Sequence, residues 1–524
     1  MRKLLSTVFL IPILFACSVA QQPTQVHYAD LITEGSTKTH LSILASNEYE
    51  GRGTGQAGGE KAANYIANEF KSYGLTAPVN GSYFQPVDLI KTSFIVKEFS
   101  VNKQKFEYGK DFYVQGDNNL NTFEAKEIVF IGYGIQDETY NDLTNIDVKD
   151  KVVLLINQGE PVDASGNSII TGTKTKSDWS TSRFKRIQEL TKLQPKVILA
   201  TGSQVAEMIN RNKNRLTSGQ ISLGKVTQER LERSAIPIIN ITEAVANELI
   251  KSAKKSVTQL EKDIVNGKPN SFSIKTKFKT TLGVEAVQLQ DPNVLGLLEG
   301  SDLKDEIVVI GGHYDHDGIS ADGTIFPGAD DNGSGTVGVM ELARAFAQAK
   351  KDGHGPRRSI LFIAFAAEEK GLLGSKFYTD NPIFPLENTV TCLNLDMIGR
   401  IDDKHLNGNH NYIHVIGADK LSSELHAINE KANDDFTQME LDYMYNDPKD
   451  QMRIYYRSDQ YNFAKHGIPV IFYFSGLHPH YHTPEDTVDK IDFPMMVKRE
   501  KLVFHTAWEV ANRDQRLVVD SNKE

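Results

Sequence analysis

The feature that most constrains the fold of this chain is an alternation of short apolar runs with helical segments, which begins near residue 285. The runs are almost continuously apolar, which indicates strands that are buried on both faces of a sheet. After Gly335, the residues Val339, Leu342, Ala343 and Phe346 recur at the spacing of one helix face. We therefore expect an α/β fold with a mixed, mostly parallel sheet flanked by helices. The expected strands are residues 306–311, 359–366, 390–395, 412–416 and 469–474.

Residue types that bind metal ions follow the ends of several of these runs. In an α/β sheet the ligand site lies beyond the carboxyl ends of the strands. Two imidazoles and three carboxylates can hold a pair of divalent ions and leave positions open for water, which indicates hydrolysis. The five residues are His313, Asp330, Glu369, Asp396 and His482, in the motifs GGHYD (311–315), PGADDNGSG (327–335), AAEEKG (366–371) with NLDMIG (394–399), and HPHYHTPEDT (478–487).

The first two motifs each combine a proposed ligand with a supporting acid. A single histidine after a strand is most often a polar turn residue, but Asp315 is placed to accept the second imidazole N–H of His313. His316 and Asp317 are interpreted as solvated loop residues. An Asx turn or a helix N-cap explains one of the acids Asp330 and Asp331 well and both poorly. We assign Asp330 as the ligand that bridges both ions, and Asp331 as its supporting acid.

The later motifs supply a base and two more ligands. Neighbouring side chains diverge, so we assign Glu369 as a ligand and Glu368 as the general base. Asp396 ends an apolar strand, where an unpaired charge is unfavourable and a metal would compensate it. Of the three histidines at 478, 480 and 482, only His482 precedes Thr-Pro-Glu-Asp-Thr, and we select it as the ligand. Tyr481 is a candidate contact to a substrate oxyanion.

The first half of the chain differs in texture. Helices are expected within residues 38–75, around a glycine-rich turn at 50–55 that is weak evidence for phosphate binding. From residue 93 the pattern changes to short β-branched runs separated by polar turns, which predicts a separate β-rich insert. These runs are residues 127–132, 151–156, 196–200 and 236–241.

Composition and the N-terminus bound the class of protein. A chain of 524 residues is expected to form two to four domains, and a net charge of −10 gives no electrostatic footprint for nucleic acid. Residues 1–20 have the charged and apolar regions of a signal peptide, so we expect export to the periplasm, the cell surface or the medium. Cleavage after Ala20 competes with lipidation of Cys17, which would be the only membrane attachment. Cys392, in an apolar run, is expected to be a buried small hydrophobe.

Taken together, the motifs resemble the M28 zinc peptidases of the bacterial aminopeptidase type. The resemblance implies a discontinuous catalytic domain with the zinc exopeptidase fold, over residues 26–92 and 276–515. It implies two Zn²⁺ ions, one held by His313 and Asp396 and the other by Glu369 and His482, with Asp330 bridging and Glu368 as the base. It also implies a cis peptide after the bridging residue, between Asp330 and Asp331. Peptides are the implied substrates.

The insert, residues 93–275, resembles a protease-associated (PA) domain through the strings Gly-Tyr-Gly-Ile (132–135) and Asp-Val-Lys-Asp-Lys-Val-Val (147–153). The chain departs from many members of the peptidase family at Gln460, which stands where Ser-Asp is usually followed by histidine. That position is not a metal ligand in the family.

The expected activity is removal of N-terminal residues from peptides, and three alternatives stay open. A carboxypeptidase or dipeptidase on the same scaffold would need cations for the substrate carboxylate, for which Arg400, Arg453 and Arg457 are candidates. A glutaminyl cyclase is the second alternative and uses one zinc. The presence of both His313 and the acid pair argues against it. A receptor-like relative would have lost ligands, whereas all five positions are filled here. The sequence does not reveal the oligomeric state.

Overall fold

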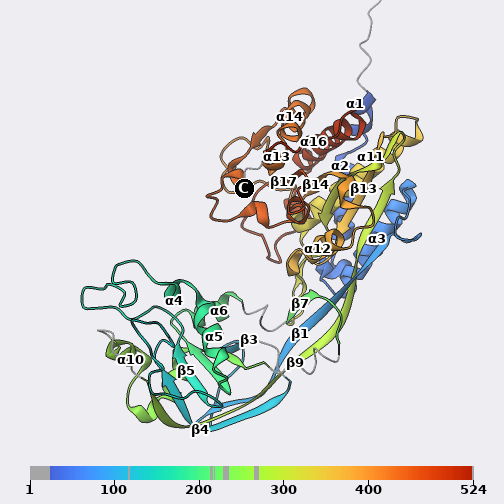
Figure 1. Cartoon of the computed structure of the whole chain (residues 1–524). Helices are drawn as coiled ribbons and strands as arrows, with labels where there is room; N and C mark the ends of the chain where they lie inside the picture. The colour runs from blue at the N-terminus through green and yellow to red at the C-terminus, as the bar shows by residue number, and fades with distance from the viewer. Residues whose placement is uncertain are drawn as a thin grey trace, which may run out of the picture.

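The computed structural model describes residues 24–115, 119–212, 216, 219–227, 235–264 and 271–521. The expected signal peptide, with Cys17 and Ala20, lies outside these residues. The described chain forms two lobes (Figure 1). We call the lobe built from residues 24–92 and 276–521 the main lobe, and the lobe built from residues 93–275 the insert lobe.

The main lobe is built on a mixed, mostly parallel sheet, as the sequence predicts. Its strand order is β16-β15-β17-β14-β10-β13-β9. Strand β10 pairs in parallel with both β13 and β14, β14 pairs in parallel with β17, and β9 and β15 each add an antiparallel pair. The strands are β9 (Ser271–Leu298), β10 (Leu303–His313), β13 (Arg358–Phe365), β14 (Thr389–Leu395), β15 (Tyr412–Ile416), β16 (Glu440–Asp442) and β17 (Val470–Phe474), with a separate hairpin of β11 (Gly318–Ile319) and β12 (Ile325–Phe326).

Helices cover both faces of this sheet, because successive strand residues point to opposite sides. Val308 and Ile310 of β10 join a core cluster with helices α1, α2, α3, α11 and α16, whereas Val309 joins a second cluster with α12 and α15. Burying one such aliphatic side chain contributes roughly 1.5–3 kcal/mol. Cys392 lies fully buried in the second cluster, as predicted. The helices are α1 (Thr24–Ala29), α2 (Glu34–Leu44), α3 (Ala57–Tyr73), α11 (Gly335–Lys351), α12 (Leu373–Asp380), α13 (Ala418–Leu421), α14 (Ser423–Ala432), α15 (Gln460–Ala464) and α16 (Phe493–Asn512).

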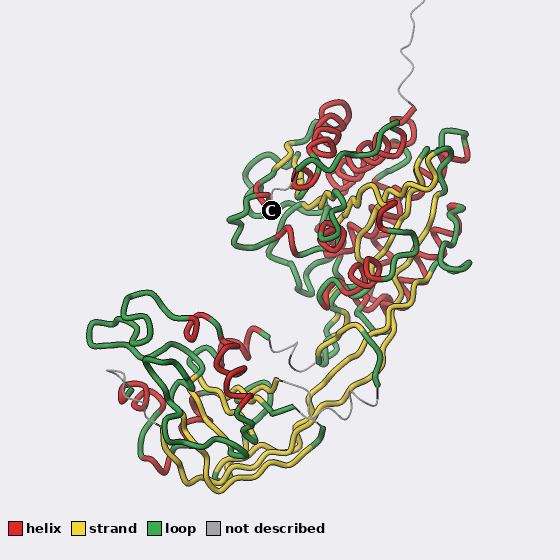
Figure 2. The backbone as a smooth tube through the Cα atoms, viewed as in Figure 1, coloured by secondary structure: helices red, strands yellow, loops and turns green. Residues whose placement is uncertain are grey.

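The insert lobe has cores of its own, but it is not purely β-rich as the sequence suggested. Strands β4, β5, β6 and β8 are parallel neighbours, with helices between β5 and β6 and between β6 and β8 (Figure 2). The sequence interpretation missed these helices because they are short, with four to ten residues each. The strands are β1 (Phe84–Val101), β2 (Gln104–Lys105), β3 (Phe112–Gln115), β4 (Asn121–Ile131), β5 (Val152–Ile156), β6 (Val197–Thr201), β7 (Gln220–Leu223) and β8 (Ile238–Ile241), and the helices are α4 (Asp178–Thr181), α5 (Arg183–Lys192), α6 (Val205–Arg211), α9 (Glu243–Leu249) and α10 (Val257–Asp263).

An antiparallel arm of β1 and β9 connects the lobes (Figure 1). Its register runs from Phe84 opposite Val294 to Val101 opposite Phe278. Strand β9 also pairs with β13 at one end and with β4 at the other. Both expected domain boundaries, after residues 92 and 275, therefore fall inside continuous strands, and the division into a catalytic domain and a PA-like domain stays a prediction. Among the described residues, no helix combines the length and the apolar character that a membrane crossing requires.

Candidate metal centre

The predicted site residues come together at the carboxyl ends of adjacent strands. His313 is the last residue of β10, Asp396 directly follows β14, and Glu368 and Glu369 lie in the turn after β13. His482 lies in the loop that follows β17. Since β17, β14, β10 and β13 are consecutive in the sheet, their ends converge on one place.

One acid, Asp331, lies between two groups of ligand-type side chains. The Nε2 atom of His313 lies 3.6 Å from Asp331 Oδ1 and 3.5 Å from Asp396 Oδ2. On the other side, His482 Nε2 lies 3.2 Å from Asp331 Oδ2 and 3.4 Å from Glu369 Oε2. Donors that each lie about 2.0–2.2 Å from one tetrahedral ion are about 3.3 Å from one another. The spacing therefore fits two ions that share Asp331.

This geometry corrects the assignment of the two adjacent acids. Asp330 turns away from the cluster, because its Oδ1 accepts hydrogen bonds from Gly399 N at 2.7 Å and Ser334 Oγ at 2.9 Å. Its Oδ2 instead faces His478 Nε2 at 3.2 Å. Asp331 thus lies where the bridging ligand was expected, and Asp330 lies where the supporting acid was expected. The cis peptide is likewise found one residue later than expected, between Asp331 and Asn332.

The neighbouring acids Glu368 and Glu369 diverge as expected. Glu369 Oε1 accepts a hydrogen bond from His316 Nδ1 at 2.9 Å while its other oxygen faces His482. Glu368 Oε2 lies 3.7 Å from His313 Nε2, on the other side of the cluster. Burial raises the pKa of Glu368, Glu369 and Asp331 above their ordinary values. Several buried carboxylates with raised pKa values form an environment that divalent cations would stabilise.

The supporting contact of His313 differs from the one expected. His313 Nδ1 lies 3.0 Å from the main-chain oxygen of Asp315, not from its carboxylate, which is 3.8 Å away. The Asp315 carboxylate instead accepts hydrogen bonds from Thr54 Oγ1 at 2.9 Å and from the main-chain nitrogen of Glu368 at 3.0 Å. Asp315 therefore positions both His313 and the Glu368 turn. Ser458 Oγ donates a 2.6 Å hydrogen bond to Asp396 Oδ2.

Two residues that the sequence interpretation left in a solvated loop belong to the centre. His316 is fully buried and contacts Glu369. Asp317 Oδ2 lies 2.9 Å from His482 Nδ1, in the carboxylate–histidine arrangement that orients metal ligands. The signal that could have identified them is their position, because both directly follow His313-Tyr314-Asp315 at a strand end.

Of the three histidines in the loop after β17, only His482 faces the acids of the cluster. His478 contacts Asp330, and His480 lies against Arg400. Gln460 is fully buried and donates a 2.8 Å hydrogen bond to the main-chain oxygen of Tyr455, so this departure from the family pattern has a structural partner.

A cavity of about 40 Å³ opens beside the cluster, with His313, Asp331, Glu368, Glu369 and Asp396 in its wall. The rest of the wall is mostly apolar, but it also contains Tyr481 and Arg457. The phenol oxygen of Tyr481 accepts a 3.2 Å hydrogen bond from Arg457 Nη2. The apolar lining residues are Met397, Ile454, Phe472, Phe474 and Leu477.

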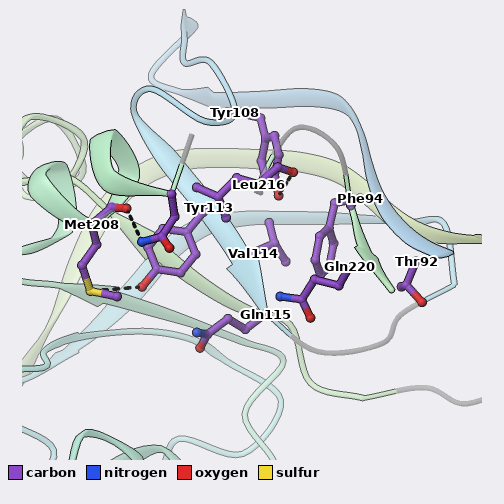
Figure 3. Close-up of a pocket in the computed structure, with 11 residues that line it drawn as sticks. Thr92, Phe94, Tyr108, Tyr113, Val114, Gln115, Met208, Leu216 and Gln220 are labelled. Carbon is purple, nitrogen blue, oxygen red and sulfur yellow. Dashed lines mark hydrogen bonds between the residues drawn. The ribbon is translucent and has the colours of Figure 1, made fainter. Parts of the chain in front are cut away.

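A larger cavity of about 200 Å³ lies in the insert lobe (Figure 3). It is lined by aromatic and amide side chains such as Phe94, Tyr108 and Gln220. None of the residues that line it is an acid, a histidine or a cysteine. It therefore offers none of the carboxylate, imidazole or thiolate groups that hold zinc, and no group for acid–base chemistry near pH 7.

A second histidine–aspartate group lies in the main lobe, but its spacing is different. Asp402 Oδ1 lies 2.6 Å from His405 Nδ1, and Asp402 Oδ2 lies 2.9 Å from His414 Nε2. Asp442, the register partner of His414 on β16, lies 3.3 Å from His414 Nδ1. The distances to Asp402 are those of direct hydrogen bonds, whereas the donors around Asp331 are 3.2–3.6 Å apart. Direct hydrogen bonds therefore connect this second group.

Known proteins resemble the part of the chain that carries this site. Residues 293–507 match the sequence model of a family described as Peptidase family M28. Aminopeptidase YwaD of Bacillus subtilis is 27% identical over 268 residues, which cover 48% of this chain and 51% of YwaD. A probable leucine aminopeptidase of Arthroderma otae is 31% identical over 229 residues, covering 42% and 58% of the two chains. The chain thus spans about half the length of these relatives.

Solved structures resemble most of the chain. An aminopeptidase from Aneurinibacillus sp. strain AM-1 superimposes with a TM-score of 0.55 at 20% identity, over 95% of this chain and 98% of that one. BSAP, a zinc aminopeptidase from Bacillus subtilis, gives a TM-score of 0.53 at 20% identity, over 92% and 96% of the two chains. At this identity the likeness shows the fold, including both lobes.

Proposed function

Because residues 293–507 form a peptidase domain of family M28, we propose that this chain is an exported dizinc exopeptidase that acts as an aminopeptidase. The observation that carries the proposal is the position of Asp331, whose two carboxylate oxygens face His313 and His482 separately. One ion would be held by His313, Asp396 and Asp331, and the other by Glu369, His482 and Asp331. The bound ions would polarise the scissile carbonyl and lower the pKa of a water molecule.

Glu368 is the residue placed to act as the general base. Its main-chain nitrogen is fixed by Asp315 and its carboxylate lies in the wall of the cavity, beside His313. It would take a proton from the attacking water and deliver it to the leaving amine, which is acid–base work that one carboxylate can do in both directions.

Tyr481 is the candidate donor to the substrate carbonyl oxygen. The Arg457 hydrogen bond uses the oxygen of the Tyr481 phenol as an acceptor, so the phenol proton stays available for donation. A donor aimed at a developing negative charge stabilises the transition state more than the ground state.

The positions of the arginines favour action at the N-terminal end of the peptide. A carboxypeptidase needs paired cations beside the metals to hold the substrate carboxylate. Arg400 is engaged with His480 and lies 3.9 Å from Asp486, and Arg453 stacks over Tyr456 at 4.6 Å. Of the three, only Arg457 lines the cavity. The wall of this cavity also contains four acids, which suits the ammonium group of a peptide N-terminus.

The test is hydrolysis of one peptide in three forms by the zinc-loaded full chain. We expect cleavage of the free peptide, no cleavage after N-acetylation, and little change after C-terminal amidation. Chelation should abolish the activity. Cleavage of the acetylated form together with loss of cleavage on amidation would assign the protein to the carboxypeptidase alternative.

Export rests on residues 1–20 alone, so its test is separate. The mass of the N-terminal peptide of the protein isolated from its host distinguishes a lipid on Cys17 from cleavage after Ala20. An uncleaved N-terminus would contradict export by this route.

A further inference from the structure

We infer that Arg52 is a positioning residue for the metal centre, which sets the distance between the loop that carries His313 and the loop that carries Asp331. This inference rests on the proposed two-ion function. Arg52 is fully buried, and within the described part of the chain it donates only to main-chain carbonyl groups. Its Nε donates to Tyr314 O at 2.8 Å, and its Nη2 donates to Gly328 O at 2.7 Å.

The remaining donor of Arg52 completes a four-way connection. Nη1 donates to Pro327 O at 2.7 Å and to Leu44 O, at the end of α2, at 2.9 Å. Tyr314 directly follows His313, and Pro327 and Gly328 lead directly into Asp330 and Asp331. One rigid guanidinium group therefore fixes both ligand loops to each other and to α2, within a few residues of the two ligands that face one another across 3.6 Å.

The backbone around Arg52 is shaped to bring it this close. Arg52 and Gly51 both have left-handed φ values, of 55° and 64°. A Cβ atom at Gly51 would lie 2.2 Å from Phe326 O and 2.9 Å from Gly318 O, so only glycine fits against the β11–β12 hairpin. The main-chain oxygen of Arg52 in turn accepts a hydrogen bond from His316 N at 3.3 Å. The glycine-rich turn at 50–55 thus supports the ligand loops, and a phosphate role is not needed to explain it.

The direction of these hydrogen bonds matters for the metal ligands. Asp331, Asp486 and Asp315 are all near enough to favour the charged form of Arg52, and burial lowers its pKa only to about 10, so it stays charged at neutral pH. Because its donors are directed at carbonyl groups, the positive charge stabilises the acidic cluster without forming an ion pair that would occupy Asp331. An arginine that paired with Asp331 would compete with the ions.

The experiment compares Arg52→Met with Arg358→Met in the full chain. Arg358 is the control because it is also buried in the main lobe and donates to the carbonyl groups of Val510 and Arg513, in addition to an ion pair with Glu306 at 2.6 Å. It is the first residue of β13, at the end opposite the ligands. Zinc affinity is measured by competition with a chelator, and the melting temperature is measured on the metal-free protein.

We expect both substitutions to lower the melting temperature, and only Arg52→Met to weaken zinc binding, by about 10–100-fold as for other residues that orient metal ligands. Equal zinc affinities in the two variants would overturn the inference. If Arg52→Met does not fold, Arg52→Lys replaces it, because lysine keeps the charge but has one nitrogen in place of three. Wild-type zinc affinity in the lysine variant would show that the charge suffices and that the directed hydrogen bonds do not position the loops.

The outcome is separable from that of the proposed function. A wild-type chain that binds no zinc, or that binds zinc and cleaves no peptide, contradicts the function. A wild-type chain that binds two ions with an affinity that Arg52→Met and Arg52→Lys leave unchanged contradicts only the inference about Arg52.

Discussion

Asp317 and His482, which are 165 residues apart in the sequence, form a 2.9 Å contact between Asp317 Oδ2 and His482 Nδ1. The opposite ring nitrogen of His482 faces Asp331 and Glu369. The acid thereby fixes the orientation of the ring and favours a proton on Nδ1, so that Nε2 would present its lone pair to a bound ion.

Removing this acid is expected to weaken one metal position. Asp317→Ala should lower zinc affinity by about 10–100-fold because the His482 ring loses its orienting partner. Chelator competition measures the effect. Asp322→Ala is the control, since Asp322 is an exposed acid in the neighbouring turn. Equal affinities in the two variants would show that the loop holds His482 without help from Asp317.

The adjacent acids Asp330 and Asp331 are expected to respond differently to the same change. Asp331→Asn should lose at least one ion and nearly all turnover, because it removes the carboxylate shared by both groups. Asp330→Asn should keep both ions, because an amide oxygen can still accept the hydrogen bonds from Gly399 N and Ser334 Oγ. Metal analysis of the two purified variants decides, and loss of metal from Asp330→Asn alone would restore the assignment made from the sequence.

The neighbouring glutamates offer a second paired comparison. Glu368→Gln should retain both ions and lose about 10²–10⁴-fold in turnover, which is the usual effect of removing a general base. Glu369→Gln should instead lower zinc affinity, since its Oε2 faces His482. Zinc content and kcat are measured for each variant. If Glu368→Gln loses zinc and Glu369→Gln does not, the two roles are reversed.

The Asp402–His414–Asp442 group predicts a pH-dependent contribution to stability. Burial alone would lower the pKa of His414, but hydrogen bonds with Asp402 and Asp442 raise it above its ordinary value. A raised histidine pKa in the folded state means that the stabilisation is fully present below the unfolded pKa, about 6.5, and is lost as the pH rises through the folded value.

His414→Gln should therefore destabilise the protein by about 1–3 kcal/mol near pH 6, and by less near pH 9. Urea unfolding of the metal-free protein at the two pH values measures the difference. The exposed His410, changed to Gln, serves as the control and should show the same small effect at both pH values. A loss for His414→Gln that grows with pH would contradict the assigned direction of the pKa shift.

Much of the main lobe could be predicted from the sequence because its strands are buried on both faces and read as apolar runs. The expected strand at 412–416 coincides with β15, and 390–395 lies within β14. The long arm of β1 and β9 was not predicted, because polar residues interrupt every apolar run in it. The apolar residues Phe272, Ile274, Phe278 and Leu282 of β9 nevertheless lie on one face, at the period of two that a strand requires.

The limit on predicting the site was side-chain direction. Motif spacing placed His313, Glu369, Asp396 and His482 at one edge of the sheet, but it could not say which of two adjacent acids turns inward. That depends on the backbone angles of a single turn, in which Asp331 and Asn332 depart from helical values. For the same reason the inward turn of His316 and Asp317 has no signature in composition.

The long pairing of β1 with β9 makes the whole insert lobe, in topological terms, the loop of a β-hairpin. Thr92 and Ala286 are register partners on that hairpin, so residues 93–285, which contain the insert lobe, leave and return at neighbouring points. A two-residue turn can close such a gap. An ancestral gene could therefore gain or shed this lobe in one event, without disturbing the register of β9 on β13 or the strand ends where the acids and histidines meet.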